Sequence, residues 1–370
     1  MPESKLHELS EHGQSVWIDY LSRKLIHEGG LERMMREDAV VGVTSNPTIF
    51  QKAIAEGNAY DDQLRSCLER ATDAKEIFLK LAVTDIQDAC DLLRRVWDHG
   101  KGQDGYVSME VDPSLAYKRE ATFDEAMRLH EWIDRPNLLV KIPATEPGLG
   151  AIEDSIARGK SINITLIFSL ERYREVVEAY LRGLERLVAD GGDPTGVASV
   201  ASFFVSRVDT EADKRLEAIG SDEALALRGK LAVANAKLAY EHYRQVFAGE
   251  RWEALTSKGA TRQRCLWAST STKNPAYRDV LYVEELIGPE TVNTMPQETI
   301  EAFQDHGRVE PTLVRGLDEA QALLADLERV GIDYDDVTDT LEREGVQKFA
   351  DSFDELLQGV RSKQGELVGA

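Results

Sequence analysis

The sequence is poor in cysteine and has no pattern that would use it. Only three cysteines occur among 370 residues, and no Cys-x-x-Cys pair is present. An odd number of thiols without paired spacing argues against both a disulfide framework and a thiolate metal site. We therefore predict that Cys67, Cys90 and Cys265 are reduced thiols in the protein core.

Long hydrophobic runs are missing as well. No apolar stretch approaches the roughly 20 residues that a membrane-spanning helix needs. The opening MPESKLHELSEHGQ also lacks the apolar centre of a secretion signal. These absences predict a cytoplasmic protein without membrane spans.

Basic residues are outnumbered. The chain has 44 Lys and Arg against 66 Asp and Glu, which gives a formal net charge of −22. An acidic surface repels phosphate backbones and anionic lipid headgroups, so neither nucleic acid nor a membrane is expected as a partner. A small anion could bind only at a local cluster of positive charge. Net charge does not determine assembly, and both a monomer and a homodimer stay open.

Motifs for cofactors are absent too. Gly148 and Gly150 form an isolated G-x-G that continues into neither a dinucleotide-binding motif nor a P-loop. The seven histidines show no metal-ligand spacing. The sequence therefore predicts chemistry that needs no cofactor and no metal.

What the chain does contain is an alternation of short apolar runs with longer segments of helical periodicity. The eight runs are at 15–20, 39–45, 106–111, 137–143, 161–168, 197–204, 264–270 and 290–295. The helical segments are at 21–37, two within 51–99, 121–133, 148–158, 170–189, a pair within 207–247, 276–287 and 297–304. Eight strand-helix units predict an α/β fold, a (β/α)8 TIM barrel, with a doubly wound open sheet as the alternative.

Two segments exceed a minimal barrel, and both have a helical pattern. They are an insertion at 51–99 and a C-terminal extension at 310–370. The extension carries apolar residues at spacings of three and four, namely Val346, Phe349, Phe353, Leu356, Leu357 and Val360. We predict a single domain over 1–370, in which this helix face docks on the barrel rather than on a partner protein.

Polar residues are frequent where the predicted strands end, which is where a barrel of this type carries its chemistry. One of them, Lys141, lies within an apolar run. Because strand side chains alternate, Lys141 shares a face with Leu139, whereas Leu138, Val140 and Ile142 share the other. Helices would cover the all-aliphatic face, so Lys141 is predicted to point into the barrel.

A lysine in such a place can act as a nucleophile. Removing an ammonium group from water disfavours its charged form and can lower a lysine pKa by ~3 to 5 units. The resulting amine can attack a carbonyl and form a Schiff base. The alternative is a structural ion pair of Lys141 with Glu110 or Asp19.

Other strand-end residues supply what imine chemistry needs. Glu110 and Thr165 could hold and relay a water for proton transfers at the carbinolamine. Asp19 could take and return the proton of a substrate hydroxyl, or could be the N-cap of the helix at 21–37. Four further side chains could bind substrate hydroxyls or only satisfy turns: Asn46, Asn163, Ser202 and Ser269.

At these positions the sequence resembles transaldolases, which are Schiff-base enzymes of the aldolase type, and particularly their longer bacterial form. The matching segments are TSNPTIF at 44–50, MEVDPSL at 109–115, LLVKIPAT at 138–145, INITLIFS at 162–169, SFFVSR at 202–207 and WASTSTKNPAY at 267–277. The resemblance covers roughly residues 15–295.

The resemblance implies roles for these residues. Lys141 would form the Schiff base, Asp19 would act as acid and base at the cleaved bond, and the relay water would lie between Glu110 and Thr165. Substrate contacts are implied for Asn46 and Asn163 at the dihydroxyacetone unit, for Ser202 and Ser269 beside it, and for Arg207 at the phosphate. The implied reaction moves dihydroxyacetone from sedoheptulose 7-phosphate to glyceraldehyde 3-phosphate in the pentose phosphate pathway.

The sequence departs from the family pattern just after the seventh strand. Many shorter members carry a second phosphate-contacting arginine there, whereas this chain reads STSTKNP, with Lys273 as the nearest cation. A lysine offers a point charge instead of a planar fork. We expect Arg207 and Lys273 to bind phosphate, the alternative being ordinary surface cations. Two other functions stay open: a fructose 6-phosphate aldolase-like enzyme, and a non-catalytic barrel that binds sugar phosphates.

Overall fold

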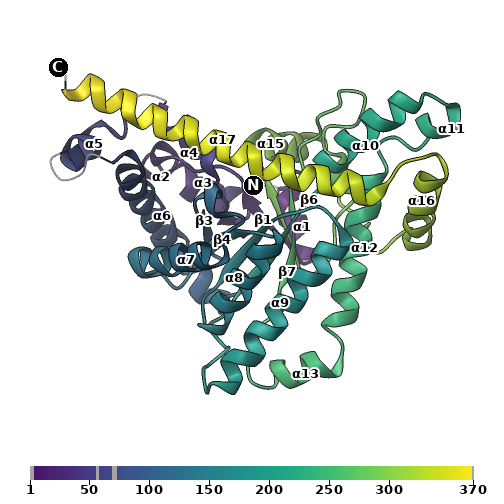
Figure 1. Cartoon of the computed structure of the whole chain (residues 1–370), viewed down its shortest axis with the longest axis horizontal. Coiled ribbons are helices and arrows are strands. Elements are labelled where there is room, and N and C mark those ends of the chain that lie inside the picture. The colour runs from purple at the N-terminus through teal and green to yellow at the C-terminus, as the bar shows by residue number, and fades with distance from the viewer. Residues whose placement is uncertain (1–3, 56–57, 69–72, 369–370) are drawn as a thin grey trace.

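A closed barrel of eight parallel strands forms the centre of the molecule. The computed structural model describes residues 4–55, 58–68 and 73–368 (Figure 1). The strands are β1 (Gln14–Ile18), β2 (Val40–Val43), β3 (Tyr106–Glu110), β4 (Leu138–Pro143), β5 (Ile162–Ile167), β6 (Ser199–Phe204), β7 (Arg264–Ala268) and β8 (Thr291–Met295). Each strand pairs with its neighbours in sequence, and β8 pairs with β1. The predicted (β/α)8 barrel is therefore confirmed, and the open sheet is wrong.

Helices surround the barrel (Figure 1). They are α1 (Lys5–Glu11), α2 (Arg23–His27), α3 (Gly30–Glu37), α4 (Pro47–Ala55), α5 (Asp61–Leu68), α6 (Ala74–His99), α7 (Arg119–Ile133), α8 (Glu146–Ala157), α9 (Leu170–Ala189), α10 (Ser206–Ile219), α11 (Asp222–Leu225), α12 (Leu231–Val246), α13 (Glu250–Thr256), α14 (Leu281–Glu284), α15 (Gln297–His306), α16 (Leu317–Arg329) and α17 (Tyr334–Val368). A short 3-10 turn, η1 (Pro113–Leu115), follows β3. Every predicted strand overlaps an observed one, because strands covered on both faces read as apolar runs.

The helix predicted at 21–37 is wrong as a single element. Gly29 lies in the left-handed region with φ 76°, and this residue separates α2 from α3. The hydroxyl of Ser22 accepts a hydrogen bond from the Leu25 backbone N–H at 3.1 Å and so caps α2. Asp19 is therefore not the helix cap that the sequence also allowed.

Three other helix predictions differ from the structure. The helix expected at 276–287 shortens to the four residues of α14, and the preceding stretch is a loop over the barrel mouth. The segment 51–99 contains α5, α6 and most of α4, where two helices were expected. Neither α1 nor α13 was predicted, since both are short.

Polar side chains close the end of the barrel at which the strands begin. The Arg264 guanidinium donates to Ser15 Oγ at 2.9 Å and to Asp104 Oδ1 at 3.0 Å. The indole N–H of Trp17, a buried side chain of the barrel, also donates to Asp104, at 3.1 Å. This end is filled by structural contacts, so the opposite end is the one available for chemistry.

The long C-terminal helix α17 crosses that opposite end (Figure 1). It packs against α4 and α10, which follow β2 and β6 on opposite sides of the barrel. The predicted apolar face is buried at Val346, Phe349, Phe353, Leu356 and Val360, while Leu357 is half-buried. The prediction that this face docks on the barrel is thus confirmed, and the helix covers part of the mouth.

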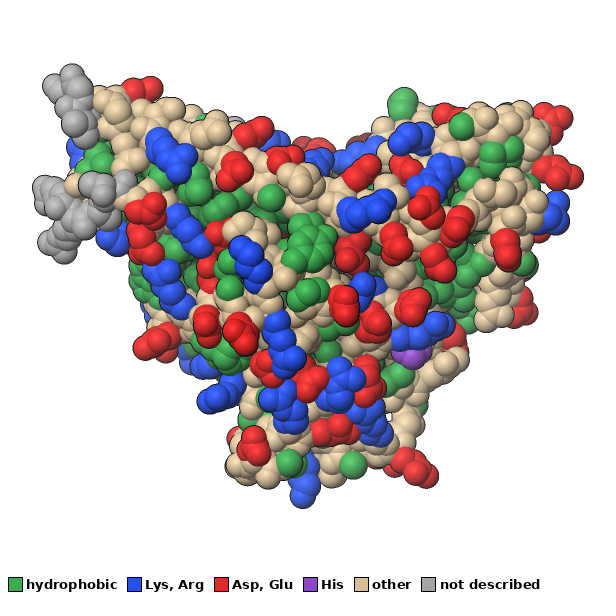
Figure 2. Space-filling view, viewed as in Figure 1, with side chains coloured by type: hydrophobic (Ala, Val, Ile, Leu, Met, Phe, Trp, Pro, Cys, Tyr) green, Lys and Arg blue, Asp and Glu red, His purple; other side chains and the backbone are tan. Residues whose placement is uncertain are grey.

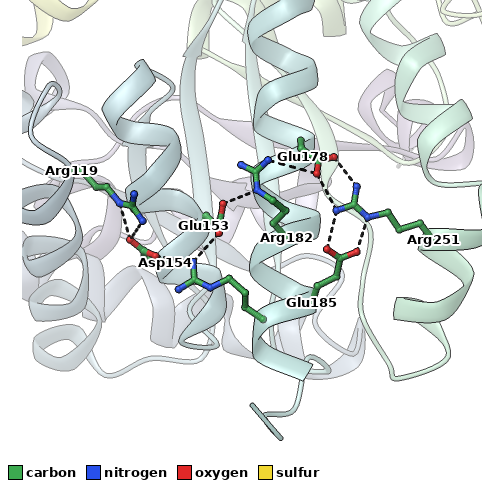
Figure 3. A network of polar contacts seen from close by, with 8 residues as sticks. Arg119, Glu153, Asp154, Glu178, Arg182, Glu185 and Arg251 are labelled. Carbon is green, nitrogen blue, oxygen red and sulfur yellow. Dashed lines mark hydrogen bonds and ion pairs between the residues drawn. The ribbon is translucent and has the colours of Figure 1, made fainter. Parts of the chain in front are cut away.

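The outer helices are joined by a surface network of ion pairs (Figure 3). Arg251 of α13 contacts Glu178 and Glu185 of α9, at 2.7 and 2.6 Å, and Arg182 of α9 contacts Glu153 of α8 at 2.8 Å. Acidic and basic side chains are interspersed over this face of the molecule (Figure 2). Exposed pairs of this kind contribute little stability one by one, so the network chiefly sets how the helices lie side by side.

Two predictions from absent sequence features also have structural outcomes. All three cysteines are buried and free, as predicted. Within 4–55, 58–68 and 73–368, no helix is both long and apolar enough to cross a membrane.

Candidate active site

A cavity of about 530 Å³ opens where the strands end. It is lined by eight of the ten predicted site residues: Asp19, Asn46, Lys141, Thr165, Ser202, Arg207, Ser269 and Lys273. The other two, Glu110 and Asn163, lie deeper, against this lining. Residues that are far apart in sequence meet here because each follows or ends a different strand of one barrel.

Lys141 points into the barrel from β4, as the alternation of its strand predicted. Its side chain is only 7% exposed, and its ammonium group donates to the Ser45 carbonyl at 3.1 Å. In the strand register it lies between Glu110 of β3 and Asn163 of β5. The Nζ atom is 3.7 Å from Glu110 Oε2. This distance fits both a structural ion pair and a pair of catalytic groups.

Glu110 is a buried carboxyl group whose only ion-pair partner among the described residues is Lys141. The side chain is 2% exposed, and neither carboxyl oxygen has a hydrogen-bond partner in the described part of the chain. Burial raises the pKa of Glu110 to about 7, and the nearby charge of Lys141 opposes that rise. The group can therefore accept and return a proton near neutral pH.

Thr165 lies on β5, on the other side of Lys141. The strand pairing shifts between Ile164 and Ile167, and Leu166 has φ 60°, which is a strained value for a leucine. This irregularity places Thr165 in the lining of the cavity, and its hydroxyl has no hydrogen-bond partner among the described residues. Polar atoms on β3 and β5 thus flank the lysine with capacity to hold a water.

Asp19 follows β1 and lines the cavity beside Lys141. The Thr44 hydroxyl donates to Asp19 Oδ1 at 2.7 Å and is itself 2.7 Å from the Thr294 hydroxyl. Burial raises the pKa of Asp19, and the charge of Lys141 and the hydrogen bond from Thr44 oppose this shift. The carboxyl group is held in one orientation and binds a proton more tightly than an ordinary aspartate.

The two predicted asparagines differ in their surroundings. Asn46 Oδ1 accepts the Ile49 backbone N–H at 3.0 Å, so the side chain amide remains as a donor toward the cavity that it lines. Asn163 is fully buried, donates to Ser108 at 3.0 Å and accepts from Ser202 at 2.7 Å. The structure therefore places Asn163 beneath the residues that line the cavity, where its hydrogen bond orients Ser202.

The Arg207 guanidinium lies between two aromatic rings at the mouth. It is 5.1 Å from the ring centroid of Phe204 and 5.8 Å from that of Phe349, on α17. Burial lowers the pKa of Arg207, and the charges of Asp19 and Glu110 oppose the shift. Among the described residues no carboxylate forms an ion pair with this cation, which the rings hold in place, so it is ready to bind an anion.

Comparison with known proteins agrees with this geometry. A family model described as transaldolase/fructose-6-phosphate aldolase matches residues 16–360. The chain belongs to this family. Relatives named transaldolase include one from Frankia alni, 52% identical over 361 residues, covering 97% of each chain. The one from Acidothermus cellulolyticus is 54% identical over 356 residues, covering 96% of this chain and 95% of the relative.

In this member of the transaldolase/fructose-6-phosphate aldolase family, the stretch after β7 also borders the cavity. Ser269 has φ 57°, and its hydroxyl lies 2.9 Å from that of Ser206 at the start of α10. Lys273 lines the same cavity and donates to the Ser271 hydroxyl at 2.6 Å. The seventh strand end therefore supplies hydroxyls and one cation to the cavity.

Sequence reasoning missed several residues of the cavity. Thr44 and Thr294 orient Asp19, whereas the sequence marked the segment TSNP only by its resemblance to transaldolases. Lys348 and Phe349 line the mouth from α17, although the tail was read only as a docking helix. Strand-end position would have flagged Thr44, but nothing in the local pattern marks Lys348. No group of three or more metal-ligand side chains occurs in the described ranges.

Proposed function

We propose that this chain is a transaldolase. It moves a dihydroxyacetone unit from sedoheptulose 7-phosphate to glyceraldehyde 3-phosphate and yields erythrose 4-phosphate and fructose 6-phosphate, a step of the pentose phosphate pathway. The observation that carries the proposal is the Lys141 amine, buried in the barrel within 3.7 Å of Glu110 and beside Asp19. Relatives from Frankia alni and Acidothermus cellulolyticus that carry the name transaldolase support it.

The first half of the reaction forms the imine and cleaves a bond. The Lys141 nitrogen attacks the C2 carbonyl of the ketose, and the carbinolamine loses water as protons pass through a water held by Glu110 and Thr165. Asp19 then takes the proton of the C4 hydroxyl. The C3–C4 bond breaks, its electron pair enters the enamine on Lys141, and the aldehyde product leaves.

The second half reverses these steps on the acceptor. The enamine carbon attacks the aldehyde carbon of glyceraldehyde 3-phosphate, and Asp19 returns its proton to the new C4 alkoxide. Water then hydrolyses the imine and frees Lys141. Asn46 and Ser269, together with Ser202 oriented by Asn163, bind the hydroxyls of the three-carbon unit. The steps balance with side chains and water, so the mechanism uses no cofactor.

The pH dependence of turnover is expected to report Glu110. Its raised pKa, about 7, means that the carboxylate form is lost as the pH falls through 7, and kcat/KM should fall with it. Glu110→Gln should lower kcat/KM by about 10²-fold at pH 8 and remove this acidic limb. The check is a profile of kcat/KM from pH 5.5 to 9 for both proteins. An unchanged limb near pH 7 in Glu110→Gln would assign it to another group.

Products formed without an acceptor separate the transaldolase from an aldolase. The family description includes fructose-6-phosphate aldolase, which makes this the second candidate. With fructose 6-phosphate alone, a transaldolase should release at most about one equivalent of glyceraldehyde 3-phosphate per site and little free dihydroxyacetone. Quantifying both products over many turnovers provides the test. Steady release of dihydroxyacetone would favour the aldolase, and absence of any adduct or product would favour a barrel that only binds sugar phosphates.

The remaining proposals concern the protein as a whole. We propose a single barrel domain over 1–370, in which 51–99 is a helical insertion and 310–370 a helical extension. A cytoplasmic location fits sugar phosphate substrates and the absence of membrane-spanning helices in the described chain. Whether the protein is a monomer or a homodimer is a matter for sedimentation analysis.

A further inference from the structure

Four cations that line the cavity form no ion pair with a carboxylate among the described residues: Lys52, Arg207, Lys273 and Lys348. The last three, from α10, the β7–α14 loop and α17, act on one another. Asp19 and Glu298 line the same cavity. In a chain of net charge −22, acidic partners are plentiful. Uncompensated cations gathered in one place therefore indicate an anion site.

The positive charges of Arg207, Lys273 and Lys348 repel one another. The pKa of Lys348 is lowered first by the charge of Arg207, then by burial and by the charge of Lys273. Like charges that line one cavity destabilise one another, and an anion bound among them removes this repulsion. A phosphate group carries a charge of about −1.5 to −2 at neutral pH and has three strong acceptor oxygens, so it can offer one oxygen to each cation and offset most of their repulsion.

The position of Lys348 is fixed by its neighbours on α17. Phe349 is 5% exposed and packs against the Arg207 guanidinium, while Val346 is buried in the docked face. One residue earlier, a Cβ on Gly345 would come 3.1 Å from Leu166 Cδ2, so the helix backbone lies close to the end of β5. Lys348 therefore extends from a rigid segment over the mouth.

We propose that Lys348 binds the phosphate of the sugar phosphate together with Arg207 and Lys273, and that it sets the preference of the site for phosphorylated aldehydes. The inference rests on the proposed function and assigns to α17 a role in substrate selection. A lysine ammonium suits this place, because a point charge on a flexible stem can follow the phosphate of substrates that differ in length.

The test compares two acceptors in the full-length protein. With fructose 6-phosphate as donor, kcat/KM is measured for glyceraldehyde 3-phosphate and for unphosphorylated glyceraldehyde. In Lys348→Ala, the ratio of the two values should fall about tenfold, as expected for the loss of one charge-assisted contact. Competitive inhibition by inorganic phosphate should weaken by a similar factor. Lys348→Arg should restore most of both effects.

The outcomes separate this inference from the proposed function. Arg361→Ala removes the same charge from an exposed site on α17 away from the cavity and should leave the ratio unchanged. If the unmodified protein transfers no dihydroxyacetone, the proposed function fails. If it does, but Lys348→Ala keeps the wild-type ratio or slows both acceptors equally, the phosphate role of Lys348 is wrong.

Discussion

Replacing Lys141 is expected to lower turnover by about 10⁴-fold or more, because it is the buried amine beside Glu110. The other lysines that line the cavity, Lys52, Lys273 and Lys348, are exposed. We suggest Lys141→Met, which nearly keeps the volume of the stem, alongside Lys141→Ala. Incubation with fructose 6-phosphate and sodium borohydride should add mass to the peptide that contains Lys141 in the unmodified protein. Neither variant should gain mass.

Folding must be checked in these variants, because Glu110 loses the cation 3.7 Å away. With its pKa already raised to about 7, Glu110 can take up a proton rather than remain an unpaired buried charge. Circular dichroism and a thermal melt serve this purpose. Lys258→Ala, at an exposed site in the loop before β7, is the matched control and should stay fully active. A borohydride adduct that persists in Lys141→Met would place the imine elsewhere.

Asp19→Asn is expected to separate imine formation from bond cleavage. The amide keeps the shape of the side chain and an oxygen for the 2.7 Å hydrogen bond from Thr44, but it cannot take the proton of the C4 hydroxyl. We expect kcat to fall by about 10² to 10⁴-fold, the usual range for loss of a general acid and base. Borohydride trapping of fructose 6-phosphate on Lys141 should remain.

Trapping and turnover are measured on the same preparation, so the two effects can be compared directly. Asp193→Asn makes the same change in an exposed loop before β6, at the other end of the barrel, and should alter neither quantity. Equal loss of trapping and turnover in Asp19→Asn would show that Asp19 assists the lysine chemistry rather than the cleaved bond.

Much of the fold could be predicted because parallel strands covered on both faces are continuous apolar runs. The same pattern predicted where Lys141 lies, because a charged residue in such a run points into the barrel rather than toward the covering helices. The helix at 21–37 was misread because the pattern continues across Gly29, and only the backbone shows that φ 76° interrupts it. Local periodicity does not reveal that break.

The site was predictable to the extent that it depends on strand ends. Asp19, Asn46 and Thr165 could be placed because every strand end opens on the same cavity. The depth of Asn163 below the cavity could not be predicted. It depends on how the strands are staggered around the barrel, and the sequence of a single strand does not show this stagger. Lys348 could not be found at all, because an apolar helix face has the same spacing whether it docks beside a site or far from one.

The docking of α17 across the mouth affects when the lining of the cavity is completed during synthesis. All eight strands precede this helix in the chain, so the barrel can close while α17 is still inside the ribosome. Until it emerges, the Arg207 guanidinium lacks the Phe349 ring that packs against it. A nascent chain would hold a formed barrel with an open mouth, and sugar phosphates would meet Lys348 and Phe349 only after this helix has emerged.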